Sequence, residues 1–369
     1  MKKKKSNKIN LIICGIAFIF MIFYVYFVDG FDNLSNSLGK INFLYLLIAV
    51  GLMLLYWLLE AMGVHAVLRT TYHSPDRKFY KTLIVAILGQ YFNCITPSSS
   101  GGQPMQVYYF TKFGIPMSHA MTALLSKFIV YQFVLTAYSA VVLILRFSTF
   151  SEQFAPLMVL VMIGFIINTI VIILLLMLAF FKAPVKKAVI WIIKLLGKIH
   201  ILKTQKSVDD KVAMVGKIID EYHENFLFIR KKPWLIIRMV LYTLVQLTAY
   251  FSISYVIYLG FGLEGTDFFT IISCQAFVLM ISAFMPLPGA LGAAEGSYSL
   301  FFSNIFKSGE DSFVGISTFI WRFLTFYLPI LVGLVLSLFL GKIMKIDAPA
   351  SSETLELTDS EIQGDSVEQ

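Results

Sequence analysis

Long apolar runs separated by short polar segments dominate this chain. A helix needs about 20 apolar residues to cross the hydrocarbon core of a bilayer, and we identify six runs close to that length. They lie at about residues 11–28, 41–67, 118–145, 156–181, 236–260 and 313–341. The pattern therefore predicts an all-α polytopic membrane protein with six full spans.

Two further apolar regions, about 79–113 and 267–307, are interrupted by proline and glycine. The first break reads Thr-Pro-Ser-Ser-Ser-Gly-Gly-Gln-Pro over residues 96–104, and the second reads Met-Pro-Leu-Pro-Gly-Ala-Leu-Gly-Ala-Ala-Glu-Gly over residues 285–296. Such sequences end helices, and broken backbone persists at membrane depth only where protein or a watery cavity satisfies it. Paired interruptions in two halves of a membrane protein favour a transport site over a plain anchor.

The basic residues indicate how these two regions enter the membrane. If each region crossed once, the lysine-rich segment 182–235 would lie outside, against the positive-inside rule. If each region enters and leaves on one side, that segment, the 68–81 loop and both termini are all cytoplasmic. We therefore expect two opposed re-entrant hairpins, the first dipping from the cytoplasmic face and the second from the external face.

The same arrangement predicts an inverted repeat. A span, a hairpin and a span over 41–145 recur with opposite orientation over 236–341. In each break a proline precedes a glycine by four residues, and a polar residue, Gln103 or Glu295, follows. Each half then carries one basic residue inside its last span.

Composition supports the membrane assignment and limits the function. Hydrophobic residues make up 58% of the 369 positions and charged residues 14%, whereas about a quarter of a soluble domain is charged. The net charge of +8 lies in segments that flank the spans, which suits anionic lipid headgroups and not nucleic acid. We expect one transmembrane domain over 1–346, with 182–235 as its basic amphipathic cytoplasmic loop, and an acidic disordered tail over 347–369.

The amino end combines a run of lysines with the apolar residues 11–28 and so resembles a signal peptide. The apolar run is longer than a typical signal sequence, and no small-residue cleavage site follows it. We expect a retained first helix whose amino end is cytoplasmic.

Charged side chains inside spans are costly and are therefore candidate site residues. Lys127 and Arg322 lie deep in their spans, Glu295 lies at the second break, and Glu60 lies nearer the cytoplasmic end of its span. One hypothesis places both cations around an anionic headgroup, because guanidinium binds phosphate in bidentate fashion. The alternative is that internal ion pairs fix the packing. Glu295 would then balance a cation, carry a proton or contact a cationic headgroup.

The breaks also offer neutral groups. The amino ends of half-helices present backbone N–H donors and a positive dipole end, which favour phosphate or carboxylate. The further candidate substrate-binding residues are Ser99, Gln103, Gly101, Gly102, Gly289 and Gly292. For the serine, the alternative is a hydrogen bond within its own turn.

The sequence carries no Walker-type phosphate loop, no histidine cluster at metal-binding spacing and no nucleophile elbow. We therefore expect no catalytic residue, no metal and no cofactor.

The second break contains Pro-Gly-Ala-Leu-Gly-Ala-Ala-Glu at 288–295. This resembles the P-G-x-x-G-x-x-E signature of the flippase-like, lysylphosphatidylglycerol synthase transmembrane-domain family, which includes the membrane half of the multiple peptide resistance factor. Residues 96–104 and 321–327 resemble its other two blocks. Many members have Gly-Glu followed by Arg in the first block, where this chain has Gln103 and Gln106. The resemblance therefore does not imply charge binding by the first hairpin.

The resemblance implies a multi-pass flippase of the bacterial cytoplasmic membrane. Its substrate would be a phospholipid or glycolipid with a charged or polar headgroup, aminoacyl-phosphatidylglycerol among them, as in antimicrobial peptide resistance. The alternative is a membrane transferase of the phosphatidylglycerol lysyltransferase type, or an accessory subunit in lysyl-phosphatidylglycerol or glycolipid synthesis. The expected partners are anionic or aminoacylated lipids, with a second copy of the chain or a separate lipid synthase as further alternatives.

Overall fold

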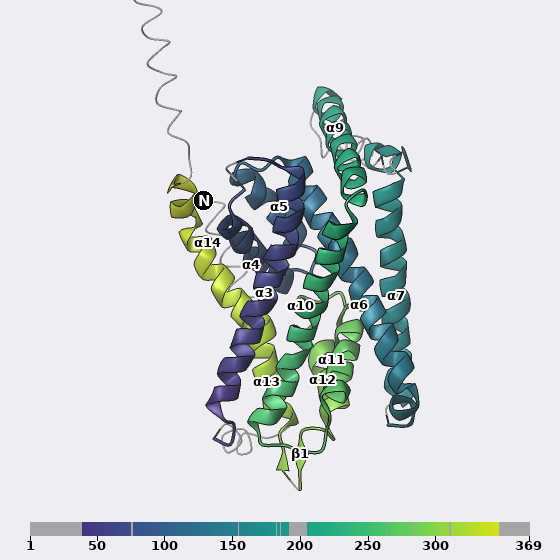
Figure 1. The fold of residues 1–369 in the computed structure, drawn as a ribbon, viewed down its shortest axis with the longest axis vertical. Helices are drawn as coiled ribbons and strands as arrows, with labels where there is room; N and C mark the ends of the chain where they lie inside the picture. The colour runs from purple at the N-terminus through teal and green to yellow at the C-terminus, as the bar shows by residue number, and fades with distance from the viewer. Residues whose placement is uncertain are drawn as a thin grey trace, which may run out of the picture.

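The computed structural model describes residues 39–346, except positions 75–76, 154, 182, 185, 192–204, 284 and 310. The predicted first span and the predicted acidic tail lie outside the described residues. The described residues form an elongated bundle of helices (Figure 1).

The elements follow one another in this chain order: α3 (Phe43–Thr71), α4 (Phe79–Ile95), α5 (Gly102–Lys112), α6 (Met117–Gln153), α7 (Ala155–Phe180), α9 (Gln205–Arg230), α10 (Pro233–Gly260), α11 (Phe268–Ser282), α12 (Ala293–Phe302), β1 (Lys307–Ser308), β2 (Asp311–Ser312), α13 (Val314–Arg322), the π-helical turn η1 (Phe323–Tyr327) and α14 (Leu328–Ile346).

Among the described residues, five stretches of helix are long and apolar enough to cross a bilayer, and they correspond to five of the six predicted spans. They cover Phe43–Thr71, Met117–Leu145, Met158–Met177, Pro233–Gly260 and Val314–Leu340. The structure thus agrees with an all-α polytopic membrane protein. The residues at the start of two of these helices explain why the helices begin there. Asn42 caps α3 by accepting the Leu44 N–H at 3.0 Å. Helix α10 begins with Pro233, which has no N–H to satisfy.

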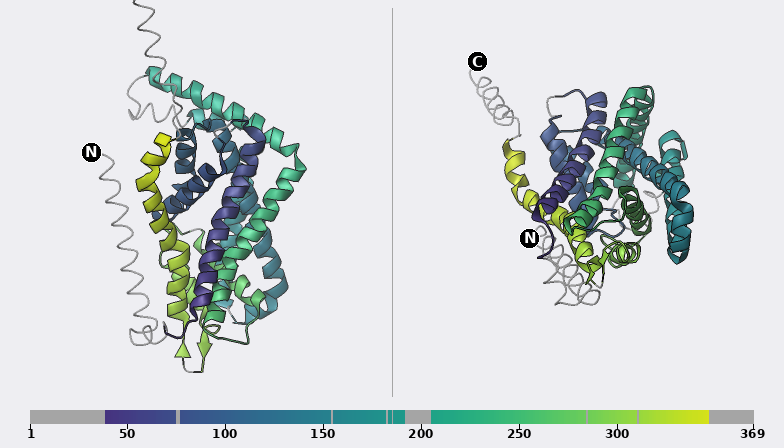
Figure 2. Two further views of the ribbon diagram at one scale, coloured as in Figure 1. Left: turned by 60° about the vertical axis from the view of Figure 1, so that its left-hand side comes forward. Right: turned by 60° about the horizontal axis from the view of Figure 1, so that its bottom comes forward.

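Helices α3 and α10 pack side by side along the length of the molecule and form its centre (Figures 1 and 2). The broken pair α4 and α5 lies at the end of the bundle that also carries α9 (Figure 1). The other broken pair, α11 and α12, lies towards the opposite end, beside β1. The two interrupted regions therefore approach the interior from opposite ends.

Within the segment predicted as a loop over 182–235, residues 205–230 form helix α9. This helix lies across one end of the bundle (Figure 2). The Nζ atom of Lys186 lies 2.9 Å from a carboxylate oxygen of Asp220, so the start of the segment is tied to α9. The amphipathic helix predicted over 184–200 falls partly outside the described residues, and positions 186–191 are helical.

The last span is not one regular α-helix. Its hydrogen-bonding pattern changes to a π-helical turn directly after Arg322 and returns to α-helix at Leu328. Such turns shift the register of the side chains that follow and occur frequently at functional sites. The span was predicted, but the turn was not.

Candidate functional site

The two breaks lie against each other. Pro97 of the first break and Pro288 of the second pair as an isolated antiparallel β-bridge. Because proline has no N–H, the pairing cannot extend as an ordinary ladder through these residues. The tips of the two broken regions thus lie against each other at this pair.

The amino end of α5 is closed by hydrogen bonds within the first break. The Gly101 N–H donates to Oγ1 of Thr96 at 2.8 Å, and the Gly102 N–H donates to Oδ1 of Asn93 at 3.1 Å. A Cβ on Gly102 would lie 2.1 Å from that same Oδ1. The two glycines therefore permit a tight turn, and their N–H groups already have partners. The prediction that they present donors to a substrate does not describe this geometry.

The tip of the first break is polar and open. Ser98 and Ser99 are exposed and have φ angles of 50° and 52°, a left-handed conformation that is uncommon for residues other than glycine. Gln103 is partly exposed, and no hydrogen bond of its side chain is recorded among the described residues. Ser99 and Gln103 are thus the predicted site residues of this break that remain available to a ligand.

The second break is held by residues with positive φ and by tight packing. Gly289, Ala290 and Gly292 have φ angles of 59°, 53° and 84°. A Cβ on Gly289 would lie 2.0 Å from Cε2 of Phe326 in the π-helical turn. Both glycines were predicted as substrate-binding residues; here they make the turn and the close approach.

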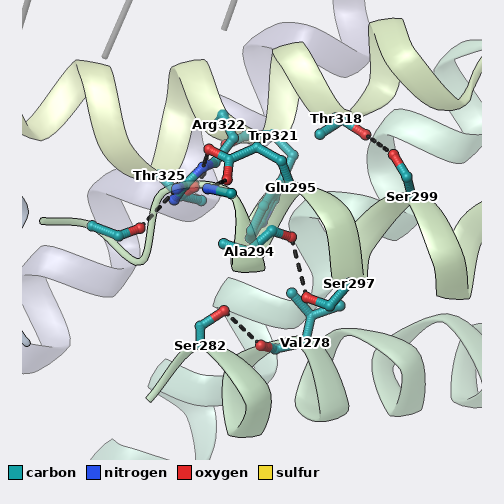
Figure 3. A network of polar contacts seen from close by, with 12 residues as sticks. Val278, Ser282, Ala294, Glu295, Ser297, Ser299, Thr318, Trp321, Arg322 and Thr325 are labelled. Atoms are coloured by element: carbon teal, nitrogen blue, oxygen red, sulfur yellow. Dashed lines mark hydrogen bonds and ion pairs between the residues drawn. The ribbon is translucent and has the colours of Figure 1, made fainter. Parts of the chain in front are cut away.

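Arg322 ties this break to the last span. Its Nε donates to Oε1 of Glu295 at 2.6 Å, and its Nη2 donates to the carbonyl oxygen of Gly289 at 2.7 Å (Figure 3). The other carboxylate oxygen of Glu295 accepts the Gly292 N–H at 2.7 Å, which caps α12. The guanidinium also lies 4.9 Å from the ring centroid of Phe326. Of the three roles considered for Glu295, the structure shows it balancing a cation.

Lys127 has a different partner. Its Nζ lies 2.5 Å from Oε2 of Glu60 and 2.7 Å from Oε1 of Gln246. The Nε2 of Gln246 donates to the same Glu60 oxygen at 2.7 Å, which closes a triangle across α3, α6 and α10. We call Glu60, Lys127 and Gln246 the Lys127 cluster. Glu60, predicted to lie nearer the cytoplasmic end of its span, therefore points into the bundle.

A layer of three tyrosines lies one helical turn from the Lys127 cluster. Tyr56 precedes Glu60 on α3 by four residues, whereas Tyr131 follows Lys127 on α6 and Tyr250 follows Gln246 on α10 by four residues. The rings of Tyr56 and Tyr250 lie 5.3 Å apart between centroids.

This tyrosine layer connects the two ion-paired regions. The Nζ of Lys127 lies 5.0 Å from the ring centroid of Tyr131, and the hydroxyl groups of Tyr131 and Tyr56 lie near each other. On the other side, the hydroxyl of Tyr250 lies near Arg322 and Thr325. The sequence reasoning missed Gln246 and all three tyrosines. The shared spacing of four residues on three spans was the signal that could have indicated them.

The structure gives Lys127 and Arg322 separate carboxylate partners on different helices. Each has its own carboxylate, and these pairs are buried, with side-chain exposures of 3% and 17% for Lys127 and Glu60 and of 6% and 1% for Arg322 and Glu295. Buried pairs of this kind leave an uncompensated charge when one partner is removed. Among the described positions, no group of three or more His, Cys, Asp or Glu residues could hold a metal ion.

Comparison with known proteins shows what the chain is similar to. A family described as "Lysylphosphatidylglycerol synthase TM region" matches residues 12–333, which is most of the chain. A protein of Archaeoglobus fulgidus described as a UPF0104 membrane protein is 24% identical over 301 residues, which is 80% of this chain and 86% of that protein.

Proposed function

The chain belongs to the lysylphosphatidylglycerol synthase TM-region family, and on this premise we propose that it translocates a lipid across a bacterial cytoplasmic membrane. The substrate is a phospholipid or glycolipid with a charged or polar headgroup, with aminoacyl-phosphatidylglycerol as the leading candidate. The observation that carries the proposal is the contact between Pro97 and Pro288, where two broken helical regions from opposite ends of the bundle meet.

Helix length supports a re-entrant course for both regions. Helices α4, α5, α11 and α12 contain 17, 11, 15 and 10 residues. At about 1.5 Å per residue they are roughly 15 to 26 Å long, and none reaches the ~30 Å of a hydrocarbon core. Each pair would then enter and leave on one side, with the basic segment 182–235 and both termini in the cytoplasm.

The polar tips offer a headgroup a course through the apolar layer. The exposed serines of the first break and the partly exposed Gln103 supply hydrogen bonds, while the acyl chains stay in the surrounding lipid. The Arg322 guanidinium has five N–H donors. Two of its nitrogen atoms contact Glu295 and Gly289, so donors remain for a phosphate when the break moves. Glu295 keeps the arginine in place between substrates.

Reconstitution into liposomes tests this function. Fluorescent lipids with anionic or lysylated headgroups are incorporated, and their passage between leaflets is followed by quenching from outside. The wild-type protein should accelerate passage, and Arg322→Gln should remove at least about nine-tenths of that rate, since a buried charge-assisted contact is worth at least ~1.4 kcal/mol.

Arg238→Gln is the matched control, because Arg238 is an exposed arginine on α10, and its rate should stay near that of the wild type. Thermal unfolding confirms that each variant is folded. A folded Arg322→Gln protein that moves lipid at the wild-type rate, or a wild-type protein that moves none, overturns the proposal.

The family description also names a synthase, which favours one alternative: a subunit that supports lipid aminoacylation. The two readings differ in what deletion changes. Loss of a translocator alters the distribution of a lipid between leaflets and leaves its total amount unchanged. Loss of a synthase subunit lowers the total amount of that lipid in whole-cell extracts.

A further inference from the structure

The two buried ion pairs differ in how open they are. Glu295 uses both carboxylate oxygens, for Arg322 and for the Gly292 N–H, and its side chain is 1% exposed. Glu60 uses only Oε2, which receives both Lys127 and Gln246, and its side chain is 17% exposed. No partner of Glu60 Oε1 is recorded among the described residues. Glu60 is thus a carboxylate with a free oxygen and partial access to the surroundings.

We infer that Glu60 occupies, in the empty protein, the place that a lipid phosphate takes on Lys127, and that protonation of Glu60 frees this place. Lipid binding on the cytoplasmic side is then linked to the uptake of one proton. This inference rests on the proposed function and adds to it the phosphate-binding residue and the ion that accompanies binding.

The chemistry of Lys127 requires an anion beside it. Its side chain is 3% exposed, and a buried ammonium without a counter-charge is strongly unfavourable. Once Glu60 is neutral, Lys127 keeps the Oε1 of Gln246 and the ring of Tyr131, but neither carries a charge. A phosphate oxygen supplies the charge that protonation removed. The cluster is neutral before the exchange and neutral after it, and no covalent bond changes.

The packing lets the lysine side chain lie across α3. A Cβ on Gly63 would lie 3.2 Å from Cε of Lys127, so a larger residue there would press on the lysine stem. Gln246 bridges both charged groups and can keep Lys127 in position when Glu60 withdraws. The triangle is therefore suited to exchanging one anion for another at a fixed cation.

Few titratable groups face Glu60. They are Lys127 and Tyr131 on α6 and Tyr56 on its own helix; α10 contributes Gln246 directly and Tyr250 in the next layer. Helices α4 and α9 and the turn η1 also pack on α3. None of them places a charged side chain within ion-pair distance of Glu60 among the described residues. The proton-dependent step is thus assigned to the Glu60–Lys127 pair.

The experiment measures binding of phosphatidylglycerol to the purified full chain in detergent micelles, at about pH 5 and at about pH 8, on either side of neutrality. The wild type should bind phosphatidylglycerol at least about tenfold more tightly at the lower pH, because binding is linked to the uptake of one proton. Glu60→Gln should bind tightly at both values, and Lys127→Met weakly at both.

Asp220→Asn is the matched control, because Asp220 pairs with Lys186 in a more exposed lysine–carboxylate pair, and it should keep the wild-type pH dependence. A competition arm with inorganic phosphate separates the two sources of the group: displacement of the lipid assigns the site to phosphate in general, and no displacement assigns it to a lipid headgroup.

Three results overturn the inference. The first is binding by the wild type that does not depend on pH, and the second is an unchanged pH dependence in Glu60→Gln. The third is a Glu60→Gln protein that unfolds more readily than the wild type and binds phosphatidylglycerol no more tightly than the wild type at the higher pH. The last is what a purely structural cluster predicts. If the wild type still translocates lipid in liposomes, these results overturn the inference about Glu60 but leave the proposed translocation standing. If binding depends on pH as expected but no lipid is translocated, the inference stands and the proposed translocation is overturned.

Discussion

Arg322 and Glu295 form an ion pair of 2.6 Å between α13 and α12, two helices that the chain separates by a small β-hairpin. Arg322 extends the contact to the carbonyl oxygen of Gly289. The pair therefore fixes the shape of the second break as well as neutralising two buried charges.

Breaking this pair from one side should destabilise the protein strongly. Glu295→Gln leaves the Arg322 guanidinium buried without a counter-charge, and we expect a loss of about 3 to 5 kcal/mol in the free energy of unfolding. Denaturant titration in detergent measures this change. The control is the exposed pair of Lys40 and Asp311, which lie 2.7 Å apart and whose side chains are 48% and 61% exposed. Asp311→Asn should lower the free energy of unfolding by at most about 1 kcal/mol. Equal losses at the two sites would contradict this account.

Gly289→Ala should disturb the second break through packing. The new methyl group would lie 2.0 Å from a ring carbon of Phe326, which forces the break away from the π-helical turn, and lipid passage in liposomes should fall several-fold. Gly309→Ala separates packing from backbone strain, because Gly309 has φ of +60° but nothing within 4 Å of its added Cβ. Only the first substitution should reduce transport. Similar losses in both would assign the effect to φ alone.

The contact of the two breaks can be tested by a disulfide. Opposed residues of an antiparallel pair have Cα atoms about 4.5 to 5.5 Å apart, within the range that a disulfide spans. Cysteines at positions 97 and 288, in a background without the three native cysteines, should cross-link under mild oxidation. Cysteines at 97 and 309 should not. If transport requires the tips to separate, the cross-linked protein should be inactive and recover on reduction.

The orientation in the membrane predicts which residues a water-soluble reagent reaches. Lys217 on α9 and Lys307 on β1 are both exposed and lie towards opposite ends of the bundle. A cysteine at 217 should react only when the cytoplasmic face is accessible, and a cysteine at 307 should react in intact cells. The reverse pattern would invert the proposed topology.

The sequence predicted well what depends on local composition. The spans follow from apolar length, and both breaks follow from their prolines and glycines; Lys127 and Arg322 stood out because charge is rare within spans. The contact of Pro97 with Pro288 could not be derived in this way, because it depends on how two distant regions meet.

The sequence did not predict which side chains pair with the buried charges. Glu60 faces Lys127 because of the way α3 is rotated about its axis. That rotation is set by packing against α10 and α6, which a single sequence does not reveal. The π-helical turn after Arg322 has no local sequence signature of the kind that proline gives a kink. The glycines of the two breaks were predicted correctly as residues that end helices. The N–H groups of Gly101, Gly102 and Gly292, however, donate to side chains of the protein itself.

Lys127 and Arg322 are each matched by one carboxylate, and this bears on how a membrane potential acts on them. Moving one elementary charge through a membrane potential costs or yields about 2.3 kcal/mol per 100 mV. An intact pair is neutral as a unit, so the membrane potential does little net work on it when both partners shift together. If the protein translocates lipid as proposed, the electrical work of a cycle then falls on the headgroup and on any accompanying proton.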